Sequence, residues 1–342
     1  MTGLLTLVVV VLAIIAIVRV VRVMELSTEL SGEDDSIITR KDNRFNGVLM
    51  IVFLVIGVGA MVYFTLDAKK YLLPVSASKH GVITDKLLDV NWILLIVVFL
   101  ITQFLLFYYS FKYYHKKEAK ARFYPINHTL EVVWTVIPTI VLGGMIVYGL
   151  IVWNDITKPA PPDSTLIEIY GKQFDFTARY AGADNKLGKS SFLLITDDNP
   201  LGVDSTDAAS MDDIITKELH LPVNSKILLK IHSRDVIHSV YLPHFRAQMN
   251  AVPGMTTEFF FEPTITTKQM REITKNDKFN YVLLCNKICG VAHYNMKMNV
   301  VAEEAEEFNK WVTAQPLVFP KPVAPQAAPA PETTTASVVK PM

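Results

Sequence analysis

Three long runs of apolar residues, each without a charged residue, occupy much of the first half of the chain. The runs cover residues 47–66, 92–111 and 132–154. A helix of about 20 apolar residues is long enough to cross the hydrocarbon core of a lipid bilayer. A weaker run over residues 6–18 continues past Arg19 and Arg22. The pattern therefore predicts four membrane-spanning helices.

The hydrophobic pattern changes to short alternating segments after the last apolar run. In these segments Val, Ile, Phe, Tyr and Thr alternate with polar residues between turns rich in Pro, Gly, Asn and Asp. The segments are residues 165–170, 174–180, 227–233, 256–261, 279–284 and 297–302. This pattern is typical of an all-β domain, and we predict a Greek-key β-sandwich. Residues 303–312 read as a short amphipathic helix, and the Pro- and Ala-rich residues 315–342 as a disordered tail.

These patterns divide the chain into five expected segments. They are two N-terminal spans (1–66), a loop (67–91), a helical hairpin (92–154), the β domain (155–314) and the tail (315–342). Half of the residues are hydrophobic (51%) and few are charged (19%), which is typical of membrane helices joined to a soluble module. We therefore expect a lipid bilayer, and no nucleic acid, as a partner.

Loop charges predict the orientation in the membrane. The loop at residues 112–127 carries five basic residues against one acid, and residues 19–46 also carry five basic residues. Lys and Arg resist translocation, so both loops are predicted to be cytoplasmic. Four spans then place residues 67–91 and the β domain outside the cytoplasm. No basic residue precedes the first apolar run, which favours an uncleaved anchor.

The only two cysteines of the chain, Cys285 and Cys289, lie in a segment that continues to His293 and Met296. Thiolate and thioether ligands beside imidazole favour copper. A further histidine, His238, follows an upstream strand-like run and is expected in a loop. One copper ion of the blue-copper type needs one Cys, two His and a weak Met, so one cysteine is surplus. Two thiolates can bridge two metal ions that share an electron, and the pattern predicts an electron relay.

Other interpretations of the cysteine pair are a disulfide and a zinc site. Two cysteines four positions apart suit a disulfide in an oxidising compartment, and zinc takes closed sets of Cys and His. The added Met and the second histidine favour copper over both. The remaining histidines of the region, His232 and His244, are expected to be structural or solvated.

With these residues the chain resembles subunit II of the haem-copper cytochrome c oxidases, which holds a dinuclear copper centre called CuA. The resemblance covers about residues 90–312 and includes further matching stretches at 218–223, 233–239, 252–254 and 307–311. It implies a cupredoxin fold for the β domain and no haem in this chain. It also implies six copper ligands: His238, Cys285, the backbone carbonyl of Lys287, Cys289, His293 and Met296.

The resemblance implies that the chain passes electrons from a c-type cytochrome to haem in subunit I, where oxygen is reduced and protons are translocated. Glu131 stands in the first turn of the last span, where the family has a glutamate at the mouth of a proton-uptake path. Carboxylates at the membrane boundary are functional candidates. The simpler interpretation is that an acid in the first turn complements the helix dipole.

Several positions depart from the family pattern. Lys287 replaces a glutamate whose carboxylate helps to hold Mg, and an ammonium offers no lone pair to a cation; we expect intact copper binding and an absent or altered Mg site. Phe174 replaces the tryptophan at which electrons enter. Gln248 and Asn250 replace charged residues. We therefore expect a membrane-held or complex-tethered haem c donor, with Phe174 as the electron-entry candidate.

Two further features leave alternatives open. A family member of ordinary length has two spans, so the pair at about residues 4–24 and 47–66 is additional and either contacts another subunit or simply anchors the chain. Residues 190–213 hold six acids and no Lys or Arg, as in a solvated loop or a face that steers a basic donor. The CuA subunit of a nitric oxide reductase and the copper-free subunit II of a quinol oxidase remain alternative functions.

Overall fold

The computed structural model describes residues 2–31, 39–116, 120 and 122–319. The chain forms two compact units. One unit comprises the residues up to Leu72 together with Trp92–Ile137, and the other comprises Leu73–Asn91 together with the residues from Pro138 onward. The part of the predicted tail at residues 320–342 lies outside the described residues.

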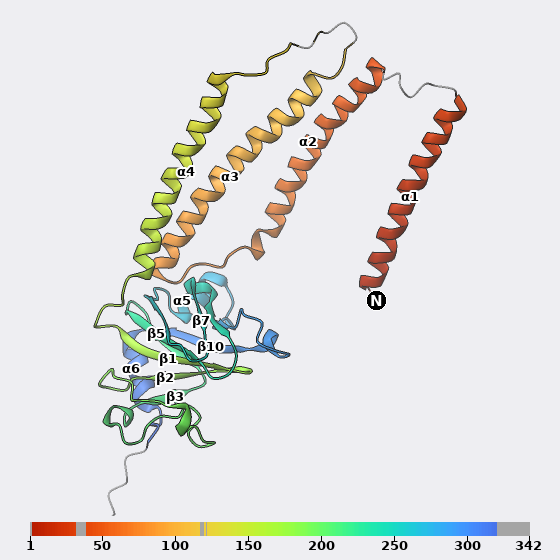
Figure 1. Cartoon of the computed structure of the whole chain (residues 1–342). Helices are drawn as coiled ribbons and strands as arrows, with labels where there is room; N and C mark the ends of the chain where they lie inside the picture. Colours follow the sequence, from red (N-terminus) through yellow and green to blue (C-terminus); the bar gives the residue numbers. More distant parts are fainter. Residues whose placement is uncertain (1, 32–38, 117–119, 121, 320–342) are drawn as a thin grey trace, which may run out of the picture. The chain divides into compact units, whose positions relative to one another are not determined.

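Four long apolar helices confirm the predicted spans. They are α1 (Thr2–Ser31), α2 (Arg40–Ala68), α3 (Lys79–Lys112) and α4 (His128–Thr157) (Figure 1). All four are long and apolar enough to cross a membrane. Their apolar side chains remain largely exposed in the isolated chain, as expected for helices whose natural solvent is lipid.

Helices α2 and α3 pack against each other within the first unit. The rings of Phe53 and Phe107 lie 5.6 Å apart between centroids, and Gly47 is buried against Phe111. A Cβ at Gly47 would lie 3.4 Å from the Phe111 ring, so the small residue lets the two helices approach closely.

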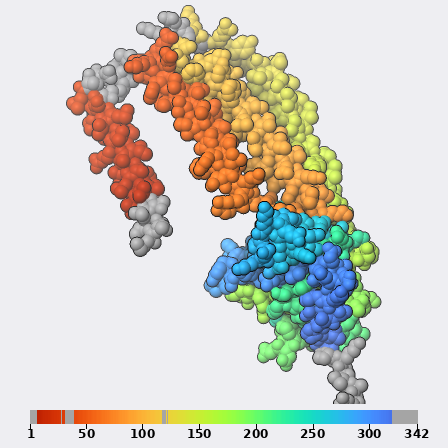
Figure 2. All heavy atoms as spheres, turned by 180° about the vertical axis from the view of Figure 1, so that it is seen from behind, coloured from red at the N-terminus to blue at the C-terminus, as the bar shows by residue number. Residues whose placement is uncertain are grey.

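The second unit holds a β-sandwich of ten strands and two helices. The elements are β1 (Thr165–Lys172), β2 (Asp175–Tyr180), β3 (Ile214–Thr216), β4 (Leu219–Pro222), β5 (Ile227–Ser233), β6 (His238–Leu242), β7 (Ala247–Ala251), β8 (Thr257–Phe261), α5 (Thr267–Thr274), β9 (Tyr281–Leu284), β10 (Lys297–Glu303) and α6 (Ala305–Ala314). Their order is β3-β2-β1-β5-β8 in one sheet and β4-β10-β9-β6-β7 in the other. The predicted cupredoxin-like sandwich is thereby confirmed, and Figure 2 shows α6 on its surface from behind.

The core between the two sheets follows the predicted alternation. Ile167 and Ile169 on β1, Leu229 on β5, Leu283 on β9 and Val300 on β10 are fully buried. Burying an aliphatic side chain of this size contributes roughly 1.5–3 kcal/mol. The core therefore fixes the strands whose ends carry the functional residues.

The pairing of the strands departs from a purely antiparallel pattern. β1 pairs in parallel with β5, and β4 in parallel with β10. Side-chain alternation records which face of a strand is buried but not the direction of its neighbour. The short strands β3, β4, β6 and β7 lie outside the predicted segments.

The connection between α2 and α3 is part of the β-sandwich unit. Ala77 and Ser78 are fully buried. The amide of Ala77 donates to the carbonyl of His244 over 2.7 Å, and its carbonyl accepts from the amide of Thr264 over 2.8 Å. The guanidinium of Arg246 donates to both carboxylate oxygens of Asp85, each over 2.8 Å. Helix α3 accordingly begins at Lys79, ahead of its apolar run.

Candidate metal centre

Two strand ends bring the predicted metal ligands together. Strand β9 ends immediately before Cys285, and β10 begins immediately after Met296. The amide of Cys285 donates to the carbonyl of Met296 over 3.1 Å and closes the loop between them. His238 is the first residue of β6, which pairs with β9. The expectation that His238 lies in a loop is therefore wrong, because the antiparallel pairing of β6 with β7 extends to this residue.

The two cysteine sulfurs lie 3.9 Å apart and are free thiols. This separation is much longer than the S–S bond of about 2.05 Å in a disulfide. It is shorter than twice the metal–sulfur bond length of about 2.3 Å, so one metal ion can bond both sulfurs. The geometry therefore fits thiolates that share a metal ion and does not fit a disulfide.

Each sulfur has two further donors beside it. The Cys285 Sγ lies 3.9 Å from the His238 Nδ1 and 3.3 Å from the Lys287 carbonyl oxygen. The Cys289 Sγ lies 3.6 Å from the His293 Nδ1 and 3.7 Å from the Met296 Sδ. All six predicted donors are thus gathered, and the soft sulfur and imidazole donors fit copper.

The donors lie in a mostly buried environment. His238, Cys285, Cys289 and Met296 are buried, whereas His293 is half-buried. Burial, and after it the neighbouring Cys285 sulfur, raises the pKa of the Cys289 thiol to about 11. A metal ion must therefore displace a proton from this thiol when it binds.

A hydrogen-bond network behind the donors orients His238. Its Nε2 donates to the Asp235 Oδ1 over 2.7 Å, so its Nδ1 is the nitrogen left for a metal. The amide of Gln173 donates to the Asp235 Oδ2 over 2.7 Å, and the Gln173 side chain donates to the carbonyl of Cys289 over 2.6 Å. Such partners of metal-binding imidazoles fix the tautomer and the ring orientation. Sequence reasoning missed both roles, and the only signal was the position of Asp235 three residues before His238.

The turn between β1 and β2 packs directly on the metal-binding loop. A Cβ at Gly171 would lie 3.2 Å from the His238 ring, and one at Gly290, whose φ is +136°, would lie 2.9 Å from the Phe174 ring. Phe174 is half-buried in this contact. The predicted electron-entry residue thus touches the segment that carries the metal donors.

The other residues singled out in the sequence contribute no side-chain donor to this centre. Glu131 belongs to the helical unit, in the first turn of α4, where its carboxylate lies 3.2 Å from the His128 Nδ1. The Lys287 side chain is exposed. Gln248 donates to the Ser239 hydroxyl over 2.8 Å and to the Asn250 side-chain oxygen over 3.2 Å.

Most of the acidic side chains in residues 190–213 accept hydrogen bonds or form an ion pair within the β unit. Asp204 and Asp207 accept hydrogen bonds from nearby backbone amides, Asp212 accepts from the amide of Ala183, and Asp213 pairs with Arg179. The other two acids, Asp197 and Asp198, are exposed. The acidic composition therefore reflects turn formation more than a charged docking face.

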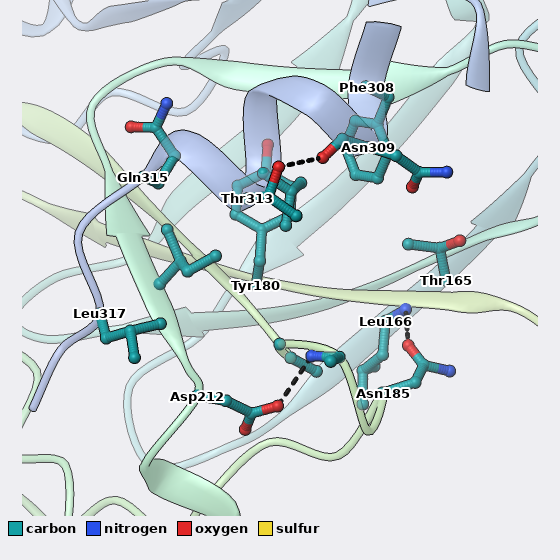
Figure 3. A pocket seen from close by; sticks show the side chains of 15 residues that line it. Thr165, Leu166, Tyr180, Asn185, Asp212, Phe308, Asn309, Thr313, Gln315 and Leu317 are labelled. Carbon is teal, nitrogen blue, oxygen red and sulfur yellow. Dashed lines mark hydrogen bonds between the residues drawn. The ribbon is translucent and has the colours of Figure 1, made fainter. Parts of the chain in front are cut away.

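One cavity of the β unit lies away from the metal donors. It has a volume of about 600 Å³ and is lined by Tyr180, Phe308, Leu317 and the first residues of β1 (Figure 3). Asn185 and Asp212 accept hydrogen bonds from backbone amides at its edge. The metal donors lie at the other end of β1, where Gly171 meets His238.

A cupredoxin-like domain with a thiolate, imidazole and thioether donor set, joined to membrane-spanning helices, defines a membrane-bound copper protein. Two family models match the chain: the transmembrane domain of cytochrome c oxidase subunit II over residues 67–152 and its periplasmic domain over residues 165–304. The chain belongs to the cytochrome c oxidase subunit II family and is a subunit of that oxidase complex. Neither of these two models extends over the first two spans.

Individual relatives agree with the family models. The alternative cytochrome c oxidase subunit 2 of Bradyrhizobium diazoefficiens is 32% identical, with 78% of this chain and 91% of that protein covered. The cytochrome c oxidase subunit 2 of a Synechocystis species is 26% identical, with 84% and 88% covered. A crystal structure of the periplasmic domain of subunit II of cytochrome oxidase from Bradyrhizobium japonicum is 24% identical, covers 46% of this chain and 96% of that domain, and has a TM-score of 0.30.

Proposed function

We propose that the six donors hold a dinuclear CuA centre that receives electrons from a c-type cytochrome and delivers them to haem in subunit I of a proton-translocating oxidase. The observation that carries this proposal is the even distribution of donors about two sulfurs 3.9 Å apart. Each sulfur has one imidazole nitrogen and one weaker donor beside it. A single tetrahedral ion needs four ligands, so six donors with two shared sulfurs favour two ions.

The chain's contribution to electron transfer is to hold the donors still. Copper bound here would supply one-electron redox chemistry. The ends of β6, β9 and β10 fix the loop, and Asp235 fixes the imidazole of His238. Donors held by a rigid scaffold need to move little when charge changes, and this preorganisation favours fast transfer.

The outer face of the metal-binding loop favours contact with partners. Ile288, Val291 and Tyr294 are each at least 90% exposed although they are large and apolar. Exposed apolar groups clustered beside a functional site mark an interaction surface. We assign this face to contacts with subunit I or with the c-type donor, on the periplasmic side of a bacterial inner membrane.

Electron entry through Phe174 and the nature of the donor form the next part of the proposal. The contact of Phe174 with the segment at Gly290 supports entry at this position. Phe174 stands in place of the family's tryptophan, and the uncharged Gln248 and Asn250 stand in place of charged residues. These departures support a donor haem c that is held at the membrane or tethered to the complex.

Copper binding and Mg binding are expected to be separable in this chain. The backbone carbonyl of Lys287 points at the Cys285 sulfur over 3.3 Å, which supports its role as a copper ligand. The exposed ammonium of the same residue repels a cation. We therefore propose intact copper binding with an absent or altered Mg site. A Mg ion liganded beside Lys287 in the assembled oxidase would contradict the second half.

We propose proton entry at Glu131 from the position of this residue in its helix alone. A carboxylate in the first turn of a membrane-spanning helix is a functional candidate, and this side chain is half-exposed. The test is proton uptake by the assembled oxidase with Glu131→Gln, which should fall, against Asp155→Asn, at an exposed carboxylate near the other end of α4, which should not change it.

The copper proposal is tested by loading the full chain with copper in detergent. We expect two copper ions per chain and an electron paramagnetic resonance spectrum with seven hyperfine lines, because one unpaired electron is shared by two equivalent nuclei. Four lines and one copper ion per chain would overturn the dinuclear assignment. A Cys289→Ser variant provides the reference spectrum, since it leaves a single thiolate.

A further inference from the structure

A second cavity lies beside the metal centre and is formed by the inserted segment together with the connection from β5 to β6. Its volume is about 510 Å³, and its wall includes Tyr170, Ser190, Phe192, His232, Arg234 and Met255. A cavity of this size is in the range that holds small organic molecules. None of the six proposed copper donors lines it.

The wall of this cavity carries basic and hydroxyl groups but no carboxylate. Among the described residues that line it, the charged or chargeable groups are Arg234, His232 and the Tyr170 phenol. The inserted segment contributes only Ser190, Ser191 and apolar residues, and its six acids all lie elsewhere. The cavity wall therefore carries positive charge, although the inserted segment that forms part of it is acidic in sequence.

Arg234 is the unusual member of the wall. Its Nε is buried and has no hydrogen-bond partner, and no carboxylate of the described chain forms an ion pair with it. The other partly or fully buried arginines of this unit have partners: Arg179 has Glu168 and Asp213, Arg246 has Asp85, and Arg271 has the Phe279 carbonyl and the Asn280 side chain. An unpaired buried polar group costs free energy that a ligand can recover. The fork of a guanidinium fits a carboxylate through two parallel hydrogen bonds.

The other basic group, His232, belongs to the floor of the cavity. Its Nε2 lies 2.8 Å from the Glu168 Oε1, and its ring stacks on Tyr170 at 4.9 Å between centroids. Burial alone would raise the pKa of Glu168, but His232 and Arg179 outweigh it and hold the pKa below its usual value. Glu168 is thus an anion that already has the Arg179 guanidinium and the His232 ring as partners, and Arg234 is left to bind a further anion.

The remaining residues of the wall indicate which kind of ligand would fit the cavity. Phe192 is 79% exposed and Met255 is 58% exposed, although both are large apolar residues. The Tyr170 hydroxyl lies 3.0 Å from the Ser190 hydroxyl, and both can reorient toward a polar group. We propose that this cavity binds a small soluble carboxylate with an apolar body, held by Arg234 at its charged end and by Phe192 and Met255 at its apolar end.

The cavity is linked to the copper ligands by one short path. The amide of Arg234 donates to the carbonyl of Gly171 over 2.9 Å, and Gly171 packs on the ring of His238. A ligand on Arg234 would therefore act next to a metal donor without contacting it. The proposed carboxylate site is therefore distinct from the copper site. Either proposal can be disproved while the other holds.

The test is calorimetric titration of the full chain in detergent with two probes of the same shape. Benzoate carries the carboxylate and benzamide is its neutral counterpart. We expect benzoate to bind with a millimolar or lower dissociation constant, and benzamide to bind at least about tenfold more weakly because the paired charge is lost. Equal binding of both probes, or no heat from benzoate, overturns the proposal without any substitution.

Variants then locate the site. Arg234→Gln should weaken benzoate binding at least about tenfold, while Arg234→Lys should keep part of it. The matched control is Lys268→Gln, which removes one positive charge from an exposed position on α5 and should leave binding unchanged. Unchanged affinity in Arg234→Gln would place benzoate elsewhere and overturn the assignment to this cavity.

Discussion

His238 and Asp235 form a hydrogen bond of 2.7 Å that turns the other imidazole nitrogen toward the sulfur of Cys285. The aspartate is itself held by the amides of Val236 and Gln173. The orientation of this ligand is therefore set before any metal arrives, and it depends on a residue that contacts no metal.

Replacing Asp235 should weaken copper binding without removing a ligand. Asp235→Ala leaves the His238 ring free to rotate and to change tautomer, and losses of about 10- to 100-fold in metal affinity are typical of such partners. Competition for copper against a chelator measures the loss. Asp198→Ala is the control, since Asp198 is exposed and far along the chain in the inserted segment; equal affinity in both variants would contradict the role of Asp235.

Removing one bridging thiolate should change the kind of copper site. Cys289→Ser leaves Cys285, two imidazoles and Met296, which match the ligand set of a mononuclear blue-copper centre. We expect one copper ion per chain and a four-line spectrum. An unchanged seven-line spectrum in this variant would show that Cys289 is not a shared ligand.

The contact of Arg246 with the α2–α3 connection should contribute to the stability of the β unit. Arg246→Ala removes two hydrogen bonds to the largely covered Asp85, and a hydrogen bond to a charged group contributes about 1.5–3 kcal/mol. We expect a loss of about 2 kcal/mol in the free energy of unfolding, measured in urea. Arg246→Gly removes the same side chain, but glycine also adopts the φ of +52° at this position without strain. The difference in unfolding free energy between the Gly and Ala variants therefore measures the backbone contribution.

The same contact can be tested from its other side. Asp85→Asn weakens the pair while the Arg246 backbone is unchanged, and the double variant should be less destabilised than the sum of the two single variants. Simple addition of the two losses would mean that the residues act independently.

Acid should destabilise the β unit through His244. Burial, and after it the positive charge of Arg246, lowers the pKa of His244, and its Nδ1 is buried without a partner. The unfolded chain therefore binds this proton more readily, so the contribution to stability is present above the unfolded value of about 6.5 and is lost as the pH falls below it.

Thermal unfolding between pH 8 and pH 5 measures the effect of His244. The melting temperature should fall with acid in the wild-type chain and less steeply in His244→Gln. His128→Gln, at an exposed histidine of the other unit, should keep the wild-type slope. Parallel slopes in all three proteins would exclude His244 as the acid-sensitive group.

Sequence reasoning succeeded where one local pattern sufficed. Uncharged runs predict spans because the bilayer is a uniform solvent, and the spacing from Cys285 to Met296 gathers donors within one loop. The strand β6 was missed because its pairing with β7 is a property of two segments rather than of one. Likewise the charges of Asp204 and Asp207 are visible in the sequence, but the amides that they bind are not. The cavity around Arg234 is likewise formed by segments far apart in the sequence, so no local pattern indicates it.

The buried connection between α2 and α3 has a topological consequence. Ala77 pairs with both His244 and Thr264, so Leu73–Asn91 and the copper domain must lie in the same aqueous compartment. Loop charge is ambiguous here, because Lys79 and Lys86 would favour retention in the cytoplasm. The hydrogen bonds place this lysine-bearing loop on the same side of the membrane as the domain in spite of that bias. A soluble fragment that begins after α4 would therefore lack part of the wall of the copper domain.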